Sequence, residues 1–214
     1  MIVHRIGNNI TIESTLNKSA MKLNENEIKL IKNTAMQPIF EALQLPEYEM
    51  ILENEKVVCV EGIYDKYSME IFCNLPKNTR IFPSMGADSI IKNIPYFIAY
   101  NKNYIALWDS DDEGKRNFEK AKKLFGESES QKFGTLPNSK KIRQFRMEEM
   151  IAIKDRFMIK KTLGLSEKEK YESIIYSLYY ADKGTKSSVL NSLSDETKDN
   201  FKTLEKMITT HFDK

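Results

Sequence analysis

The sequence has few of the residues that build zinc sites, disulfide frameworks and membrane spans. It contains two cysteines and two histidines among 214 residues, and no Cys/His spacing fits a zinc site. Two cysteines are too few for a disulfide scaffold, which favours buried, reduced thiols. No apolar stretch reaches membrane-spanning length, and the N-terminus lacks a signal-peptide pattern. These absences predict a globular, cytoplasmic protein with no membrane partner.

Two further absences limit the function. No G-x-x-x-x-G-K-[ST] motif occurs, so we expect this chain to bind no nucleotide. The net charge is only +2, which is too small to indicate a nucleic-acid binder by itself. The distribution of charge along the chain is therefore more informative than its sum.

Apolar runs alternate with amphipathic helical patterns through the middle of the chain. Strands are predicted at residues 57–60, 80–83, 104–108 and 132–136, and helices at 64–72, 88–100 and 113–125. Strands that alternate with helices predict an α/β fold, in which a parallel sheet with right-handed crossovers is flanked by helices on both faces.

Two flanking regions complete the predicted organisation. Residues 1–55 form an N-terminal lead-in or linker, with a hairpin over residues 2–12 and a helical pattern over residues 23–45. Residues 56–147 form the α/β domain. Residues 148–214 have a helical pattern to the end and form a helical appendage.

Two of the predicted strands end abruptly in acidic residues. The run VVCV is followed by Glu61 and Asp65, and the run IALW is followed by Asp109 and Asp111. The C-terminal ends of parallel strands face the crevice where open α/β sheets bind ligands. Carboxylates that close repel one another unless protons or cations lie between them, and oxygen ligands suit Mg²⁺ or Mn²⁺. The sequence therefore predicts a carboxylate cluster that holds one or two such ions.

A structural role for the same acids stays open. Glu61 or Asp65 could instead cap the helix that follows them, and Asp112 begins an acidic first turn of the kind that a helix dipole stabilises. E-G-x-x-D alone favours capping, and D-x-D at a strand end is only moderately specific by itself. The two motifs together, with a βα unit between them, favour a site.

Two further segments are candidates for nucleic-acid contacts. Residues 84–88 (SMGAD) place Ser84 and Gly86 before a helix, where backbone N–H groups can bind phosphate, and a plain turn is an equal alternative. Residues 140–149 hold cations that can meet a phosphate backbone, namely Lys140, Lys141, Arg143 and Arg146. In the same segment Glu148 or Glu149 can complete a second metal site, although a solvated loop is a serious competing interpretation.

The pattern E-G-x-x-D after one strand and D-S-D-D-E-G after a later one resembles the Toprim domain of topoisomerases, primases, recombination proteins and small nucleases. The resemblance covers about residues 56–136. Within that superfamily the chain is most similar to the C-terminal nuclease region of OLD-family (overcoming lysogenization defect) proteins, through VEGIYDKYSMEIF, FPSMGADSI and ALWDSDDEGKRNFEKAKK. The lead-in also resembles the stretch that joins the ATPase to the Toprim part in that family.

The resemblance implies a Mg²⁺- or Mn²⁺-dependent endonuclease that hydrolyses DNA. It implies that the metal ligands and catalytic residues are Glu61, Asp65, Asp109 and Asp111, with Glu148 or Glu149 as a later ligand and Lys141 as a lysine that assists phosphate chemistry. It further implies defence against phage together with an ABC-type ATPase. Since this chain lacks a P-loop, it would be a fragment or a stand-alone subunit, and homo-oligomerisation stays open.

Other functions compete with this one. A Toprim primase or topoisomerase fragment would share the acids, but a primase normally carries a zinc-binding module, and a topoisomerase needs a tyrosine on a partner domain. A non-catalytic nucleic-acid-binding or assembly module would use the sheet as a scaffold and would show no metal-dependent turnover. A HAD-type phosphatase is disfavoured, because its D-x-D-x-[TV] motif opens the first strand, whereas Asp109 lies mid-chain with Glu113 at the fifth position.

Overall fold

The computed structural model describes residues 2–6, 9–13, 20–23 and 55–213, and the chain divides into two compact units after residue 50. In the first unit, β1 (Ile2–Ile6), β2 (Asn9–Glu13) and β3 (Ala20–Leu23) form an antiparallel sheet in this order. The pairing of β1 with β2 confirms the predicted hairpin, and β3 is an additional strand. The helix predicted over residues 23–45 falls, beyond Leu23, outside the described residues.

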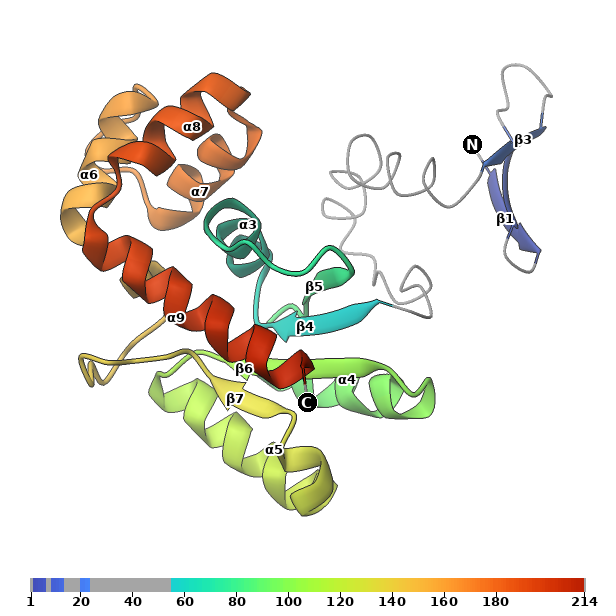
Figure 1. The fold of residues 1–214 in the computed structure, drawn as a ribbon. Coiled ribbons are helices and arrows are strands. Elements are labelled where there is room, and N and C mark those ends of the chain that lie inside the picture. The colour runs from blue at the N-terminus through green and yellow to red at the C-terminus, as the bar shows by residue number, and fades with distance from the viewer. Residues whose placement is uncertain (1, 7–8, 14–19, 24–54, 214) are drawn as a thin grey trace. The chain divides into compact units, whose positions relative to one another are not determined.

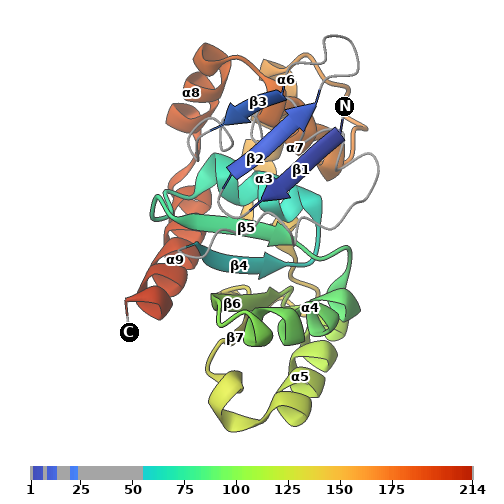
Figure 2. The same ribbon diagram turned by 90° about the vertical axis from the view of Figure 1, so that its right-hand side faces the viewer.

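The second unit is built on a parallel four-stranded sheet. Its strands are β4 (Lys56–Val60), β5 (Thr79–Pro83), β6 (Asn103–Trp108) and β7 (Phe133–Thr135), in the order β5-β4-β6-β7 (Figure 2). All four lie within one residue of their predicted bounds. The central strands β4 and β6 are almost completely buried, because helices cover both faces of the sheet. Burial on both faces explains why these strands are continuous apolar runs.

Three helices make the connections between these strands. They are α3 (Ile63–Phe72), α4 (Ala87–Ala99) and α5 (Asp112–Ser130) (Figure 1). Because β5 lies on one side of β4 while β6 and β7 lie on the other, right-handed crossovers place α3 on one face and α4 and α5 on the opposite face. The contacts agree, since α4 packs on β4, β6 and α5, whereas α3 packs on β5 and α9. The predicted α/β fold with a parallel sheet flanked by helices is confirmed.

The rest of the chain is helical. It consists of the 3-10 helix η3 (Met147–Met150) and the α-helices α6 (Ile153–Thr162), α7 (Tyr171–Tyr180), α8 (Lys183–Ser192) and α9 (Asp195–Phe212). Because α9 packs on β6 and α7 packs on α3, these helices share one hydrophobic core with the sheet, and residues 51–214 form one compact unit. No helix in the described part of the chain is long and apolar enough to cross a membrane.

A buried carboxylate joins α6 to α9. Asp155 is only 4% exposed, and its Oδ2 accepts hydrogen bonds from the Ser194 backbone N–H at 3.1 Å, from Ser194 Oγ at 2.6 Å and from Thr197 Oγ1. The Thr197 hydroxyl in turn accepts from the Ala152 backbone N–H at 2.9 Å. Donors within the chain therefore stabilise the charge of Asp155.

Candidate metal centre

The predicted acidic residues lie where the direction of the strand connections reverses. The chain passes from β4 to β5 on one side of the sheet and from β6 to β7 on the other. In open α/β sheets, this switch point opens a crevice at the carboxyl ends of the two central strands, and ligands bind there. Glu61 directly follows β4 and Asp109 directly follows β6, so both residues stand at the switch point.

Hydrogen bonds hold the acids at this edge. The Asp109 backbone N–H donates to Oε1 of Glu61 at 2.9 Å, which joins the two strand ends. In the first turn of α3, Oδ2 of Asp65 accepts from the Gly62 backbone N–H at 2.8 Å. The two motifs that are 48 residues apart in the sequence therefore meet directly.

Asp111 combines a place at this edge with a structural role. It is 4% exposed. Its Oδ1 caps α5 by accepting from the Gly114 backbone N–H at 2.8 Å, and its Oδ2 accepts from Arg146 Nε at 2.9 Å. Asp111 thus caps α5, and a guanidinium group balances its charge. The capping alternative holds for Asp65, whose carboxylate accepts from the backbone N–H of the N-cap residue Gly62 at the start of α3.

The entry into α5 requires glycine at position 114. A Cβ atom built on Gly114 would lie 2.1 Å from the carbonyl oxygen of Asp109 and 2.9 Å from its carbonyl carbon. The first turn of α5 therefore packs directly on the backbone of Asp109, which fixes Asp109 relative to the start of the helix.

Burial raises the pKa of three carboxyl groups at the edge. It raises that of Glu61 to about 7, that of Asp65 to about 6 and that of Asp109 to about 9. For Asp109, the charges of Asp65, Glu61 and Asp111 add to the rise in pKa, and the Arg146 guanidinium opposes it. At neutral pH the Asp109 carboxyl group therefore retains its proton and the Glu61 carboxyl group is partly protonated, and a cation that binds there displaces these protons.

The chemistry of these donors fits a hard divalent cation. The four acids offer only oxygen atoms, and Arg146 balances only part of their charge, which suits Mg²⁺ or Mn²⁺. As the side chains stand, however, no three Asp, Glu, His or Cys residues within the described ranges are arranged to hold one ion together. The arrangement is an acidic cluster at one edge of the sheet and not a closed coordination cage.

Of the two later acids, Glu148 shares its electrostatic surroundings with the cluster. Burial raises the pKa of the Tyr171 phenol, and the charges of Asp65, Asp109 and Glu148 raise it further. Glu148 also pairs with Arg156. The Glu149 carboxylate instead accepts from the Arg146 backbone N–H at 2.8 Å, which closes the first turn of η3. Which of the two acids serves as a later ligand stays a prediction.

Ser84 and Gly86 support the loop beside Glu61. The buried Ser84 hydroxyl contacts Cys59 Sγ at 2.9 Å and accepts from Asn93 Nδ2 at 3.0 Å. Gly86 has a left-handed φ of 115° and donates its backbone N–H to the Glu61 carbonyl at 2.7 Å. These contacts fasten the loop to β4. The phosphate contacts expected of Ser84 and Gly86 stay predictions.

Most of the cations expected to bind phosphate are paired with acids of this chain. Lys140 pairs with Glu196, Arg143 with Asp112 and Arg146 with Asp111. Lys141 lies in an exposed stretch with a φ of 54°, and its predicted catalytic role stays a prediction. The cation that lowers the pKa of Asp109 is Arg146.

Comparisons of the chain with protein-family models, with curated proteins and with solved structures find no match. A functional conclusion therefore depends on the sequence motifs and on the geometry at the ends of β4 and β6.

The motifs did not predict the surroundings of the cluster. The Tyr171 hydroxyl, on α7, forms a hydrogen bond with Ser68 Oγ at 2.5 Å. Ser68 lies one turn after Asp65 on α3. A bridge between Ser110 and Phe145 brings Arg146 beside Asp111. No local pattern indicates either contact, because each joins segments that are distant in the sequence.

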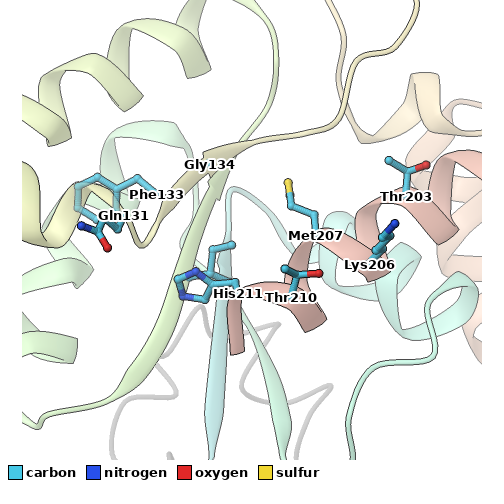
Figure 3. A pocket seen from close by; sticks show the side chains of 9 residues that line it. Gln131, Phe133, Gly134, Thr203, Lys206, Met207, Thr210 and His211 are labelled. Atoms are coloured by element: carbon cyan, nitrogen blue, oxygen red, sulfur yellow. The ribbon is translucent and has the colours of Figure 1, made fainter. Parts of the chain in front are cut away.

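A separate hollow of about 440 Å³ lies between α9 and the β6–β7 side of the sheet (Figure 3). Phe133, Met207 and His211 are among its lining residues, and His211 Nε2 lies 3.0 Å from the Tyr104 carbonyl oxygen. The four clustered acids do not line it. The hollow is therefore not part of the candidate metal centre.

Proposed function

We propose that this chain is a metal-dependent nuclease that hydrolyses phosphodiester bonds of DNA at the C-terminal ends of β4 and β6. The observation that carries the proposal is the hydrogen bond from the Asp109 backbone to the Glu61 carboxylate, which unites the two acidic motifs at the switch point. The resemblance of those motifs to Toprim nucleases supports this class of reaction.

Each residue of the cluster has a definable role. Glu61, Asp65, Asp109 and Asp111 would hold one or two Mg²⁺ or Mn²⁺ ions, with Glu148 or Glu149 as a further candidate ligand. Such an ion, when bound, supplies Lewis acidity that activates water and stabilises a leaving oxygen.

Contacts within the chain position these carboxylates. The Asp109 backbone N–H orients Glu61, and the Gly62 backbone N–H orients Asp65. The Gly114 backbone N–H and the Arg146 guanidinium orient Asp111. The first turn of α5 packs on the backbone of Asp109 and so positions it, and this kind of preorganisation is what a reaction centre requires.

Two broader parts of the proposal depend on the motif resemblance. We infer that the nuclease acts with an ABC-type ATPase, since the resembled family joins the two activities and this sequence has no P-loop. Defence against phage is the corresponding biological role.

Incubation of the full chain with supercoiled plasmid in Mg²⁺, Mn²⁺ or EDTA tests the proposal. We expect nicking with either metal, no nicking in EDTA, and none by the Asp109→Asn variant. Asp199→Asn, which makes the same substitution at an exposed position on α9, is the matched control and should nick normally. Nicking that persists in EDTA would refute metal dependence. Binding of DNA without nicking would favour a non-catalytic module.

A further inference from the structure

Basic side chains on α5 form an exposed surface that begins beside the carboxylate cluster. We name this surface the α5 basic face, and it consists of Lys115, Arg116, Lys120 and Lys123. All four residues are exposed, and together with Glu119 and Leu124 they line one shallow depression. Arg116, Lys120 and Lys123 are separated by four and three residues, which places them on the same side of the helix.

Acids neutralise little of the charge on this face. Glu119, the acid that lines the same depression, pairs with Lys122 at 3.4 Å. Lys120 lies 3.5 Å from Asp88, but both side chains are more than half exposed, and pairs of this kind contribute little. The face therefore keeps a net positive charge over roughly 12 Å of helix.

The segment at residues 140–146 differs from the α5 basic face. Three of its four cations already pair with acids of this chain, at Glu196, Asp112 and Asp111. The pairs of Lys140 and Arg143 are exposed, like that of Lys120 with Asp88, and they contribute as little. Arg146 is different, because its partner Asp111 is buried, so Arg146 must leave a buried acid to bind a phosphate. Among the described residues, no cation of the α5 basic face is held by a buried acid in this way.

We propose that the α5 basic face binds the phosphate backbone of duplex DNA and directs the duplex toward the carboxylate cluster. The inference rests on the proposed function, which makes DNA the substrate of that cluster. Because α5 begins at Asp112, directly after Asp111, Lys115 lies within one turn of the cluster and Lys123 about two turns further along. Phosphate contacts carry no base information, so this face supplies affinity and orientation.

Binding of a fluorescein-labelled DNA duplex in EDTA, over a series of KCl concentrations, tests the proposal. The test variant carries Lys115→Gln, Arg116→Gln and Lys123→Gln. The control variant makes the same change of charge at exposed lysines in the C-terminal helical part, with Lys168→Gln, Lys202→Gln and Lys206→Gln. Glutamine keeps a helix propensity close to that of lysine and arginine, so both variants should retain the fold.

We expect the log–log salt slope of the test variant to fall by about 0.9 per lost contact, or roughly 2.7 in total, while the control keeps the wild-type slope. The affinity of the test variant should fall on the order of 100-fold at moderate salt. A test variant with the wild-type slope overturns the proposal, and so does a control that loses as much, or a wild-type chain that does not bind the duplex.

Plasmid nicking in Mg²⁺ distinguishes this proposal from the proposed function. If the slopes change as expected and the wild-type chain does not nick, the DNA-binding face stands and the proposed hydrolysis fails. If the wild-type chain nicks and the test variant binds like wild type, the hydrolysis stands and the α5 basic face is wrong.

Discussion

Two regions hold carboxylates away from solvent, almost completely at Asp155 and partly at Glu61 and Asp109, and the surroundings of the two regions differ. At the junction of α6 and α9, Asp155 is surrounded by the donors of Ser194 and Thr197. At the ends of β4 and β6, Glu61 and Asp109 lie among other acids, and burial with mutual repulsion raises their pKa values. Burial is thus common to a structural acid and to a candidate ligand. The distinguishing property is whether the fold itself provides enough donors for the charge.

The largest expected effect is on catalysis at the sheet edge. Asp109→Asn should lower the rate of metal-dependent nicking by at least about 10³-fold, equivalent to roughly 4 kcal/mol, because it removes a charged ligand and keeps the shape of the side chain. The free energy of unfolding of the metal-free variant should stay constant or rise at neutral pH, since asparagine is neutral and needs no proton to lie among the other acids. Single-turnover nicking and urea denaturation measure the two quantities.

The alternative for Asp109 is a purely structural role, and the same variant tests it. A clear loss of stability in the metal-free variant, with nicking retained, would show that Asp109 behaves like Asp155. Asp199→Asn controls for the substitution itself, because that residue is exposed on α9.

The next largest effect is a loss of stability at the junction of α6 and α9, where Asp155 has a structural role. Asp155→Ala should lower the free energy of unfolding by about 3 kcal/mol, because the Ser194 N–H and the Thr197 hydroxyl would lose a charged acceptor in a buried place. Asp155→Asn keeps an acceptor and should lose less. Urea denaturation gives these values, and stability close to wild type in Asp155→Ala would contradict the assignment.

The response to pH should separate the two regions further. The pKa of Asp109 is raised from 3.8 to about 9 in the folded chain, so the unfolded chain releases its proton at lower pH than the folded chain does. The contribution of protonated Asp109 to the free energy of unfolding is therefore complete below about pH 4, and it is lost as the pH rises toward about 9. The metal-free protein should therefore be less stable at pH 8 than at pH 6, by on the order of 1 kcal/mol per pH unit, and the raised pKa of Glu61 adds to this loss up to about pH 7.

Denaturation in EDTA at several pH values measures this slope. Asp109→Asn should flatten it, whereas Asp199→Asn should keep it. Added Mg²⁺ should stabilise the wild-type chain more at pH 8 than at pH 6, because the ion competes with protons for the carboxylates. Equal slopes in wild type and Asp109→Asn would contradict the raised pKa.

The smallest expected effect concerns a contact between α7 and α3, the helix that carries Asp65. Tyr171→Phe removes the phenol that bonds to Ser68 Oγ at 2.5 Å on the helix that carries Asp65. It should lower the free energy of unfolding by about 1 kcal/mol. Tyr176→Phe, at a half-exposed position on the same helix, is the matched control and should change little. If Tyr171→Phe lowered the free energy of unfolding no more than Tyr176→Phe does, the hydrogen bond between Tyr171 and Ser68 would contribute nothing to stability.

The parallel sheet could be predicted because local signals agree with its tertiary environment. Apolar runs mark β4 and β6, and burial on both faces is what such runs favour. The switch point depends on the order of the strands in the sheet, which no single strand encodes. The sequence therefore predicted acids at the strand ends, but it did not predict the hydrogen bond between the Asp109 backbone and Glu61. The strand β3 was missed because four residues carry little periodicity.

The surroundings of the cluster could not be predicted for a physical reason. The phosphate contact expected of Arg146 stays a prediction, and what the sequence did not indicate is that the bridge between Ser110 and Phe145 places Arg146 against Asp111. Ser84 was expected to contact phosphate as well, and its hydroxyl lies in a buried network with Cys59. The charge and size of a side chain indicate what it can bind, whereas the tertiary fold determines which residues lie next to it.

The close approach at Gly114 has a consequence for anyone who transplants this acidic motif into another scaffold. Copying the carboxylates alone would leave out the residue that lets the helix sit on the backbone of Asp109, since a Cβ atom there would fall 2.1 Å from a carbonyl oxygen. The portable unit is therefore the whole segment from Asp109 to Gly114. A graft that replaced its last residue with alanine would displace the helix from the acid it is meant to hold.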